Sequence, residues 1–352
     1  MSLETTWFLL VAVLWVGYFI LEGFDFGVGI LLPFVSKNEA DRRAVLTTLG
    51  PVWDGNEVWV LVAGGATFAA FPEWYATLFS GFYLPLFLIL ISLIVRGVAF
   101  EYRSKYGKAQ WRKRWDLAIG ISSFIPALLW GVAFANIVRG VPIEKSADGN
   151  LEYVGGFFNL LNPYALLGGV VTLTVFLTHG AIFLSLKTDG EIRSRARALA
   201  VKIGLVAAVA AVLFLAWTNI SLPKVNTLVL LLSVAVALTW VIALFAGFKG
   251  REGWAFIFSA STIALFVATL FYALYPRVMP SSISSQFDLT IHNASSTHYT
   301  LKVMTIVAVV MTPVVLLYQG WTYWVFRKRV SAHQIQNPEK GILDSSSHIL
   351  HQ

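Results

Sequence analysis

The sequence lacks cysteine altogether and has few charged side chains. Without cysteine, its 352 residues cannot form disulfides or hold an iron–sulfur cluster, a thiolate-ligated haem or a copper–thiolate site. Soluble domains carry about a quarter charged residues, whereas here 13% are charged, 57% are hydrophobic and the mean hydropathy is +0.71. The composition therefore excludes an ordinary soluble protein and predicts an integral membrane protein.

Histidine is also scarce inside the apolar stretches. Of six histidines, only His179 lies within one. An oxidase core with two haems and a copper needs several intramembrane histidines, so we expect any redox chemistry to need a partner chain. A lone intramembrane histidine is more often a hydrogen-bonded packing residue than an axial haem ligand, and both interpretations of His179 stay open. Phosphate loops, zinc-ligand spacings and nucleophile elbows are absent as well.

Nine stretches are long and apolar enough to cross a bilayer as helices, which takes about 20 residues. Their apolar character is continuous rather than alternating, which excludes membrane-spanning strands. The first follows Glu4 rather than basic residues and is too long for a signal peptide, so we expect a retained helix. The predicted spans are residues 7–35, 54–71, 76–100, 116–138, 163–186, 201–218, 225–248, 254–275 and 301–326.

Basic residues indicate how these spans are oriented. Of the 26 lysines and arginines, 20 lie in one alternating set of connections, including the C-terminal tail, and five lie in the other set. The positive-inside rule then predicts the N-terminus outside and the C-terminus in the cytoplasm. An odd number of crossings, such as nine, also places the two termini on opposite sides of the membrane.

Acidic residues occur within or beside the predicted spans, although a carboxylate at a bilayer centre costs about 2.5–3.5 kcal/mol. In the predicted orientation they all fall in the cytoplasmic half, which favours proton uptake from that side over a carrier with a midplane site. They are Glu22 and Asp25 in the first span, Asp54 and Glu57 at the start of the second, and Glu101 and Asp116 around the next connection. The cation Arg96 lies near the end of the third span.

Structural roles compete with proton uptake for several of these side chains. Asp54 could cap the second span, and Glu101 and Asp116 could pair with neighbouring cations. Arg96 could extend to the interface or neutralise an acid. Asp25 and Glu57 lie a turn or more inside their spans, so a functional role is favoured for these two.

Four segments then identify a family resemblance: FILEGFDFGVGILLPF (19–34), GPVWDGNEVWVLVAGGATFAAFPEWYA (50–76), SGFYLPLFLILISLIVRGVAFEYRSK (80–105) and GFFNLLNPYALLGGV (156–170). They closely resemble subunit II of cytochrome bd-type quinol oxidases. The resemblance is specific in the first half of the chain, and the second half agrees in helix number and length. FILEG (19–23) and FLTHG (176–180) also align with each other, as in a duplicated four-helix unit with His179 in the place of Glu22.

The resemblance implies an all-α membrane protein with nine helices, as two four-helix bundles plus one peripheral helix. We expect the first bundle over residues 1–138, the second over 139–275, an outer loop with the ninth helix over 276–330, and a cytoplasmic tail over 331–352. It also implies a heterodimer with subunit I, which carries haem b and haem d and the quinol site, in a bacterial or archaeal cytoplasmic membrane. Some members hold a quinone in subunit II, and small accessory subunits occur; a nucleic-acid partner is not expected.

The family's functional residues map onto this chain by motif. Asp25 and Asp54 match acids associated with a proton route to the haems, and Trp59 lies where an oxygen route from the lipid is proposed. Glu57 occupies a variable position; we expect it to assist, with Glu22 and Glu101, while Asn56, Arg96 and His179 act as structural or charge partners. Two other classes remain: a proton-coupled transporter acting alone, and a scaffold for subunit I with incidental acids.

Overall fold

The structure, a computed structural model, describes residues 1–221 and 226–335. Residues 222–225 and 336–352, including Lys224, Lys340, His348 and His351, lie outside the described residues, as does most of the expected tail 331–352. The described chain is mainly helical, as predicted. Its helices are α1 (Leu3–Val35), α2 (Glu39–Leu49), α3 (Trp53–Ala70), α4 (Pro72–Gly81), α5 (Tyr83–Arg103), α6 (Ala109–Arg139), α7 (Pro163–Lys187), α8 (Gly190–Ser221), α9 (Thr227–Phe248), α10 (Glu252–Leu274) and α11 (His298–Val325).

Short strands and 3-10 turns occupy the connections. The strands β1 (Ile143–Lys145) and β2 (Leu151–Tyr153) form one antiparallel pair, and β3 (Arg277–Met279) and β4 (Leu289–Thr290) form another. The 3-10 turns are η1 (Phe157–Leu160), η2 (Ser285–Phe287) and η3 (Ala332–Gln334). The strand pairs lie in the two long connections predicted to face outside.

Eight helices in the described residues are long and apolar enough to cross a membrane: α1 and α5 to α11. The predicted span 54–71 coincides with α3, but this 18-residue helix carries Asp54, Asn56 and Glu57 near its start and is not among the eight. The predicted span 76–100 is divided between α4 and α5. Pro85 causes this break, since it has no N–H and its ring would clash with the carbonyl group of Gly81 in a continuous helix.

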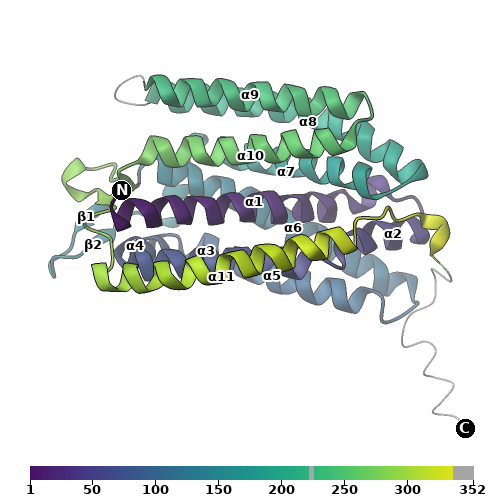
Figure 1. The fold of residues 1–352 in the computed structure, drawn as a ribbon, viewed down its shortest axis with the longest axis horizontal. Coiled ribbons are helices and arrows are strands. Elements are labelled where there is room, and N and C mark those ends of the chain that lie inside the picture. The colour runs from purple at the N-terminus through teal and green to yellow at the C-terminus, as the bar shows by residue number, and fades with distance from the viewer. Residues whose placement is uncertain (222–225, 336–352) are drawn as a thin grey trace, which may run out of the picture.

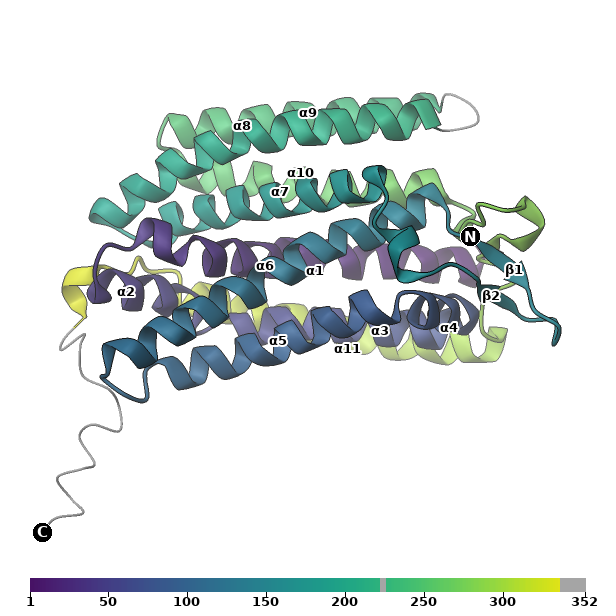
Figure 2. The ribbon, with the colours of Figure 1, turned by 180° about the vertical axis from the view of Figure 1, so that it is seen from behind.

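The long helices run roughly parallel, so the molecule has two ends (Figure 1). The N-terminus and the strands lie at one end, here called the β end. The helix α2, the turn between α5 and α6, and residues 326–335 after α11 lie at the other, here called the α2 end (Figure 2). The pair α8 and α9 forms one outer layer, α7 and α10 the next, then α1 and α6, with α3, α5 and α11 on the opposite side.

The helix α1 is central because its glycines permit close crossings. A Cβ atom added at Gly27 would lie 2.0 Å from the carbonyl oxygen of Phe176 on α7, and one added at Gly180 would lie 2.7 Å from the Gly27 backbone. Small residues at such crossings are usual where membrane helices approach closely. The aligned segments 19–23 and 176–180 therefore lie beside this crossing.

Candidate functional site

A buried cluster of charges forms where α1, α3 and α5 meet. Glu22 and Asp25, three residues apart on one face of α1, are both fully buried. Arg96 of α5 is also fully buried, and its Nη2 forms ion pairs with Glu22 and, at 2.8 Å, with Oε2 of Glu57 on α3. One guanidinium group thus pairs with two carboxylates, an arrangement in which Arg96 would neutralise these acids.

Asp25 connects this cluster to α3 and α11. Asn56 donates a hydrogen bond from Nδ2 to Oδ2 of Asp25 at 2.8 Å. Its own Oδ1 accepts from the hydroxyl of Tyr323 at 2.7 Å and from Nε2 of Gln319 at 3.3 Å. Because α11 has little other burial, these two side chains are its main polar connection to the cluster.

Four buried atoms of the cluster have no hydrogen-bond partner in the described part of the chain. They are Oε2 of Glu22, Oδ1 of Asp25, and Nε and Nη1 of Arg96. An unsatisfied buried polar atom costs about 1–3 kcal/mol, so sites of this kind usually hold ordered water. The arrangement is therefore suited to holding water and exchangeable protons.

Asp54 and Glu101 lie apart from the buried cluster, at the α2 end, and both are exposed. The N-cap of α3 is Val52 and no side chain caps this helix, so the capping interpretation of Asp54 is wrong. Asp54 lies instead in the first turn, where the helix dipole favours an anion. Glu101 forms no ion pair within the described residues, whereas Asp116 pairs with Nε of Arg103 at 2.5 Å, as expected.

Trp59 lies on the same helix as Asp54, between α1 and α11. Its indole Nε1 donates to Oε1 of Gln319 at 2.8 Å. Its ring lies against α1 at Gly17, where an added Cβ atom would be 2.2 Å from the indole. Gln319 thus joins Trp59 to the amide of Asn56.

His179 is held on every side by the protein. Its Nε2 lies 3.1 Å from the carbonyl oxygen of Ile20, to which it donates, and its Nδ1 lies 2.8 Å from Oγ of Ser259. The ring stacks on Phe256 with centroids 4.8 Å apart. Because both nitrogens are engaged, this geometry supports the packing role over iron ligation. Within the described ranges, no group of three metal-ligating side chains occurs.

A second set of ion pairs at the α2 end was missed by sequence reasoning. Arg103 binds Glu39 of α2 through two hydrogen bonds, at 2.7 and 3.0 Å. Arg195 binds Asp41 at 2.7 Å, and Glu252 pairs with Arg193 at 2.9 Å and with Arg197. Glu39 and Asp41, two acids in the short segment 39–49, could have indicated these ion pairs, but a count of basic residues alone does not consider acids.

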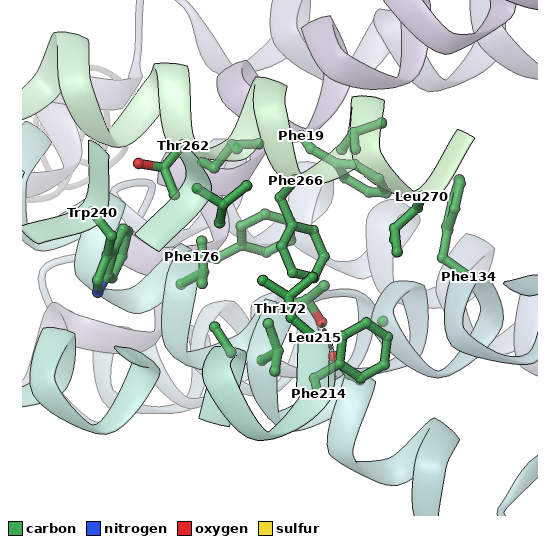
Figure 3. A pocket seen from close by; sticks show the side chains of 18 of the residues that line it. Phe19, Phe134, Thr172, Phe176, Phe214, Leu215, Trp240, Thr262, Phe266 and Leu270 are labelled. Atoms are coloured by element: carbon green, nitrogen blue, oxygen red, sulfur yellow. Dashed lines mark hydrogen bonds between the residues drawn. The ribbon is translucent and has the colours of Figure 1, made fainter. Parts of the chain in front are cut away.

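An apolar cavity of 120 Å³ lies between α6, α7, α8, α9 and α10, and none of the residues that line it is charged (Figure 3). Its polar lining groups are already engaged: Thr172 donates to the carbonyl of Ala127, Thr262 to that of Phe258, and the Trp240 indole to that of Gly204. The Trp130 indole donates to Tyr18. The cavity therefore suits a hydrocarbon chain, and it offers no free donor for the carbonyl groups of a quinone ring.

Comparison with known proteins places the chain in a family. Residues 3–326 match the pattern of the family described as cytochrome bd terminal oxidase subunit II. The chain is 44% identical to cytochrome bd ubiquinol oxidase subunit 2 of Bacillus subtilis, over 94% of this chain and 97% of the relative. It is 38% identical to cytochrome bd-I ubiquinol oxidase subunit 2 of Escherichia coli K12, over 95% and 97%.

A solved structure has the same fold. The structure of the bd oxidase from Geobacillus thermodenitrificans aligns with a TM-score of 0.73 at 20% identity, covering 93% of this chain and 100% of that chain. Together with the apolar helices, these matches identify a multi-pass membrane protein similar to bacterial oxidase subunits. The chain belongs to the family of subunit II of the cytochrome bd terminal oxidase.

Proposed function

We propose that this chain is the haem-free subunit II of a quinol:oxygen oxidoreductase and takes up protons from the cytoplasm for the reduction of oxygen to water. The observation that carries this proposal is the buried cluster of Glu22, Asp25, Glu57 and Arg96, with unpartnered carboxylate oxygens on Glu22 and Asp25. Carboxylates that only stabilised the bundle would gain from complete pairing, whereas a proton carrier needs an oxygen that is free to accept a proton.

The proposed route begins at the α2 end. Asp54 and Glu101 are exposed there and would collect protons, and Glu57, half-buried one turn beyond Asp54, would pass them inward. Asp25 is the buried acceptor, held by Asn56, while Arg96 keeps the neighbouring acids from accumulating charge. The steps between these side chains would run through water, since the structure gives no direct hydrogen bond between Asp54 and Glu57.

The arrangement of the chain in the membrane follows the charge pattern. We propose nine crossings, α3 included, with the N-terminus outside and the α2 end in the bacterial cytoplasm. Residues 1–138 and 139–275 would form the two four-helix units, and α11 would be the peripheral ninth helix within 276–330. The sparse burial of α11, whose only buried residue is Leu301, supports this last assignment.

Subunit I is proposed to cover the side of the bundle formed by α3 and α5. The Glu57 side chain is 21% exposed on this side although it lies inside the proposed membrane region. A carboxylate facing lipid would cost about 2.5–3.5 kcal/mol near the centre, so protein or water is expected to meet it. Haem b, haem d and the quinol site are assigned to that partner, since both nitrogens of His179 are engaged here.

The oxygen route is proposed to pass beside Trp59, whose ring lies among apolar residues of α1 and α3. A resident quinone, if held by this chain, would place its apolar tail in the 120 Å³ cavity and its ring elsewhere, because the donors that line the cavity are engaged. We also propose that the oxidase complex can include a small accessory subunit.

The proton role is tested with purified complexes carrying Asp25→Asn or Asp54→Asn. We expect Asp25→Asn to lower quinol-dependent oxygen consumption by about 100-fold, the range for loss of a proton-transferring group, and Asp54→Asn to lower it less. Haem absorption should be unchanged in both. Asp189→Asn, an exposed acid at the same end, is the matched control. Normal turnover in Asp25→Asn would refute proton uptake through this chain, and loss of haem in both variants would favour the scaffold function.

A further inference from the structure

A second cavity, of 320 Å³, lies at the α2 end between α2, the start of α3, the end of α7 and the residues after α11. Its cations are Lys187, Lys328 and Arg329, and its apolar wall includes Val52, Phe183 and Val325. We call it the cationic cavity. Neither the acid cluster nor the proposed oxygen route accounts for it.

The cations retain hydrogen-bond donors for a ligand. Lys187 uses two of its three N–H groups, on the carbonyl oxygens of Phe326 and Lys328. Arg329 uses Nε on the carbonyl oxygen of Leu186 at 3.2 Å, and its Nη2 lies 3.8 Å from a carboxylate oxygen of Glu252. Lys328 is exposed and forms no ion pair among residues 1–221 and 226–335.

The charge of the cavity is therefore of one sign. Within the described chain no carboxylate lines it, and the nearby Glu252, which lies 3.8 Å from Arg329, pairs more closely with Arg193 and Arg197. Three cations around one hollow repel each other unless an anion lies between them, and phosphate oxygens match both ammonium and guanidinium donors. The cavity is thus complementary to a phosphate group.

The wall of the cavity distinguishes a lipid phosphate from a soluble one. Beside the cations lie Val52, Phe183 and Val325, and the last turn of α11 brings this apolar surface to the edge of the proposed membrane. The positive-inside rule explains basic residues at this end but does not explain an apolar hollow enclosed by them. Basic pockets between helices on the cytoplasmic side are typical sites for anionic lipid headgroups.

We propose that the cationic cavity binds the headgroup phosphate of an anionic glycerophospholipid. Bound there, the lipid would lie between the end of α11, α2 and α7, whose residues line the cavity. Tyr323 lines this cavity and also donates to Asn56, so the lipid site and the acid cluster share a side chain. The proposal does not depend on proton uptake.

The test titrates the delipidated, detergent-solubilised complex with phosphatidylglycerol and follows the midpoint of thermal unfolding. We expect phosphatidylglycerol to raise the midpoint and phosphatidylcholine to leave it unchanged. In the double variant Lys328→Gln with Arg329→Gln, the lipid concentration that gives half of the shift should rise roughly 30-fold, from the usual contribution of two basic residues near an anionic headgroup. The matched control is Lys113→Gln with Arg114→Gln, an exposed pair at the same end that does not line the cavity.

Three outcomes would overturn the proposal. The first is an equal shift with inorganic phosphate alone, which would make the ligand a soluble anion. The second is an equal weakening in the control pair, which would show a general effect of surface charge. The third is an unchanged titration in the Lys328/Arg329 double variant whose unfolding midpoint without lipid matches the unaltered protein.

Discussion

Arg96 determines the stability of the charge cluster because two carboxylates depend on it. In the variant Arg96→Gln, Glu22 stays buried without its cation, and Glu57 loses its partner at 2.8 Å. Removing one partner of a buried ion pair typically costs about 3–5 kcal/mol, so we expect a lower unfolding midpoint and a reduced yield of assembled complex. The exposed Arg114→Gln is the control, measured by the same thermal unfolding.

The double variant Arg96→Gln with Glu22→Gln tests whether an unpaired charge is the cause. Removing the carboxylate together with its cation leaves a neutral pair of amides, which should recover a substantial part of the lost stability. If the double variant is no more stable than Arg96→Gln alone, the packing of the Arg96 side chain on Phe26 would explain the effect instead.

At the scale of single residues, the sequence predicted the charged members of the site and Asn56, and missed the neutral residues that α11 contributes. Glu22, Asp25, Glu57 and Arg96 are conspicuous because a charge inside an apolar stretch needs a reason. Gln319 and Tyr323 are ordinary in a membrane helix, and nothing local indicates that a side chain in α11 meets Asn56 more than 250 positions earlier. Such contacts depend on how the helices pack.

At the scale of helices, hydropathy predicted which apolar helices exist better than it predicted where they begin and end. The stretch 76–100 was predicted as one span because a hydropathy average does not register the geometry of proline, and Pro85 divides it into α4 and α5. The basic residues Arg42 and Arg43 indicate a connection at 39–49, yet Asn38 caps a helix there and Val45 and Leu49 are buried. Because the segment carries many charged residues, its hydropathy average does not indicate the amphipathic helix.

The crossing of α1 and α7 gives a prediction at this scale. In Gly27→Ala, the new Cβ atom would lie 2.0 Å from a backbone oxygen of α7, and the helices would have to separate. Overpacking of this kind costs about 1–3 kcal/mol or more. We expect a clear drop in the unfolding midpoint of the complex.

Gly120→Ala is the control for that substitution. Apart from the adjacent residues and the backbone of its own helix, no atom lies within 4 Å of the Cβ position at Gly120 in α6, so only the gain in helix propensity, of about 1 kcal/mol, should act. Equal effects of the two alanines would mean that the crossing tolerates greater separation than the structure implies.

At the scale of the whole molecule, the distribution of basic residues predicted where the chain ends lie, but the sequence did not predict how the helices pack. The parity of the spans and the distribution of basic residues predicted opposite ends for the N-terminus and the end of α11, as the structure has them (Figure 1). The sequence did not reveal that α1 lies at the centre or that α8 and α9 form an outer layer. Those facts depend on which apolar faces fit each other, and hydropathy alone does not distinguish the faces.

The absence of cysteine makes the orientation in the membrane directly measurable. Asn150→Cys places a single thiol between β1 and β2 at the β end, and Gln110→Cys places one at the start of α6 at the α2 end; both positions are exposed. In intact cells, a membrane-impermeant maleimide should label the Asn150→Cys protein at once. It should label the Gln110→Cys protein only after permeabilisation, because the α2 end carries most of the basic residues. The reverse pattern would invert the chain and place Asp54 and Glu101 on the outer side, where they could not collect cytoplasmic protons.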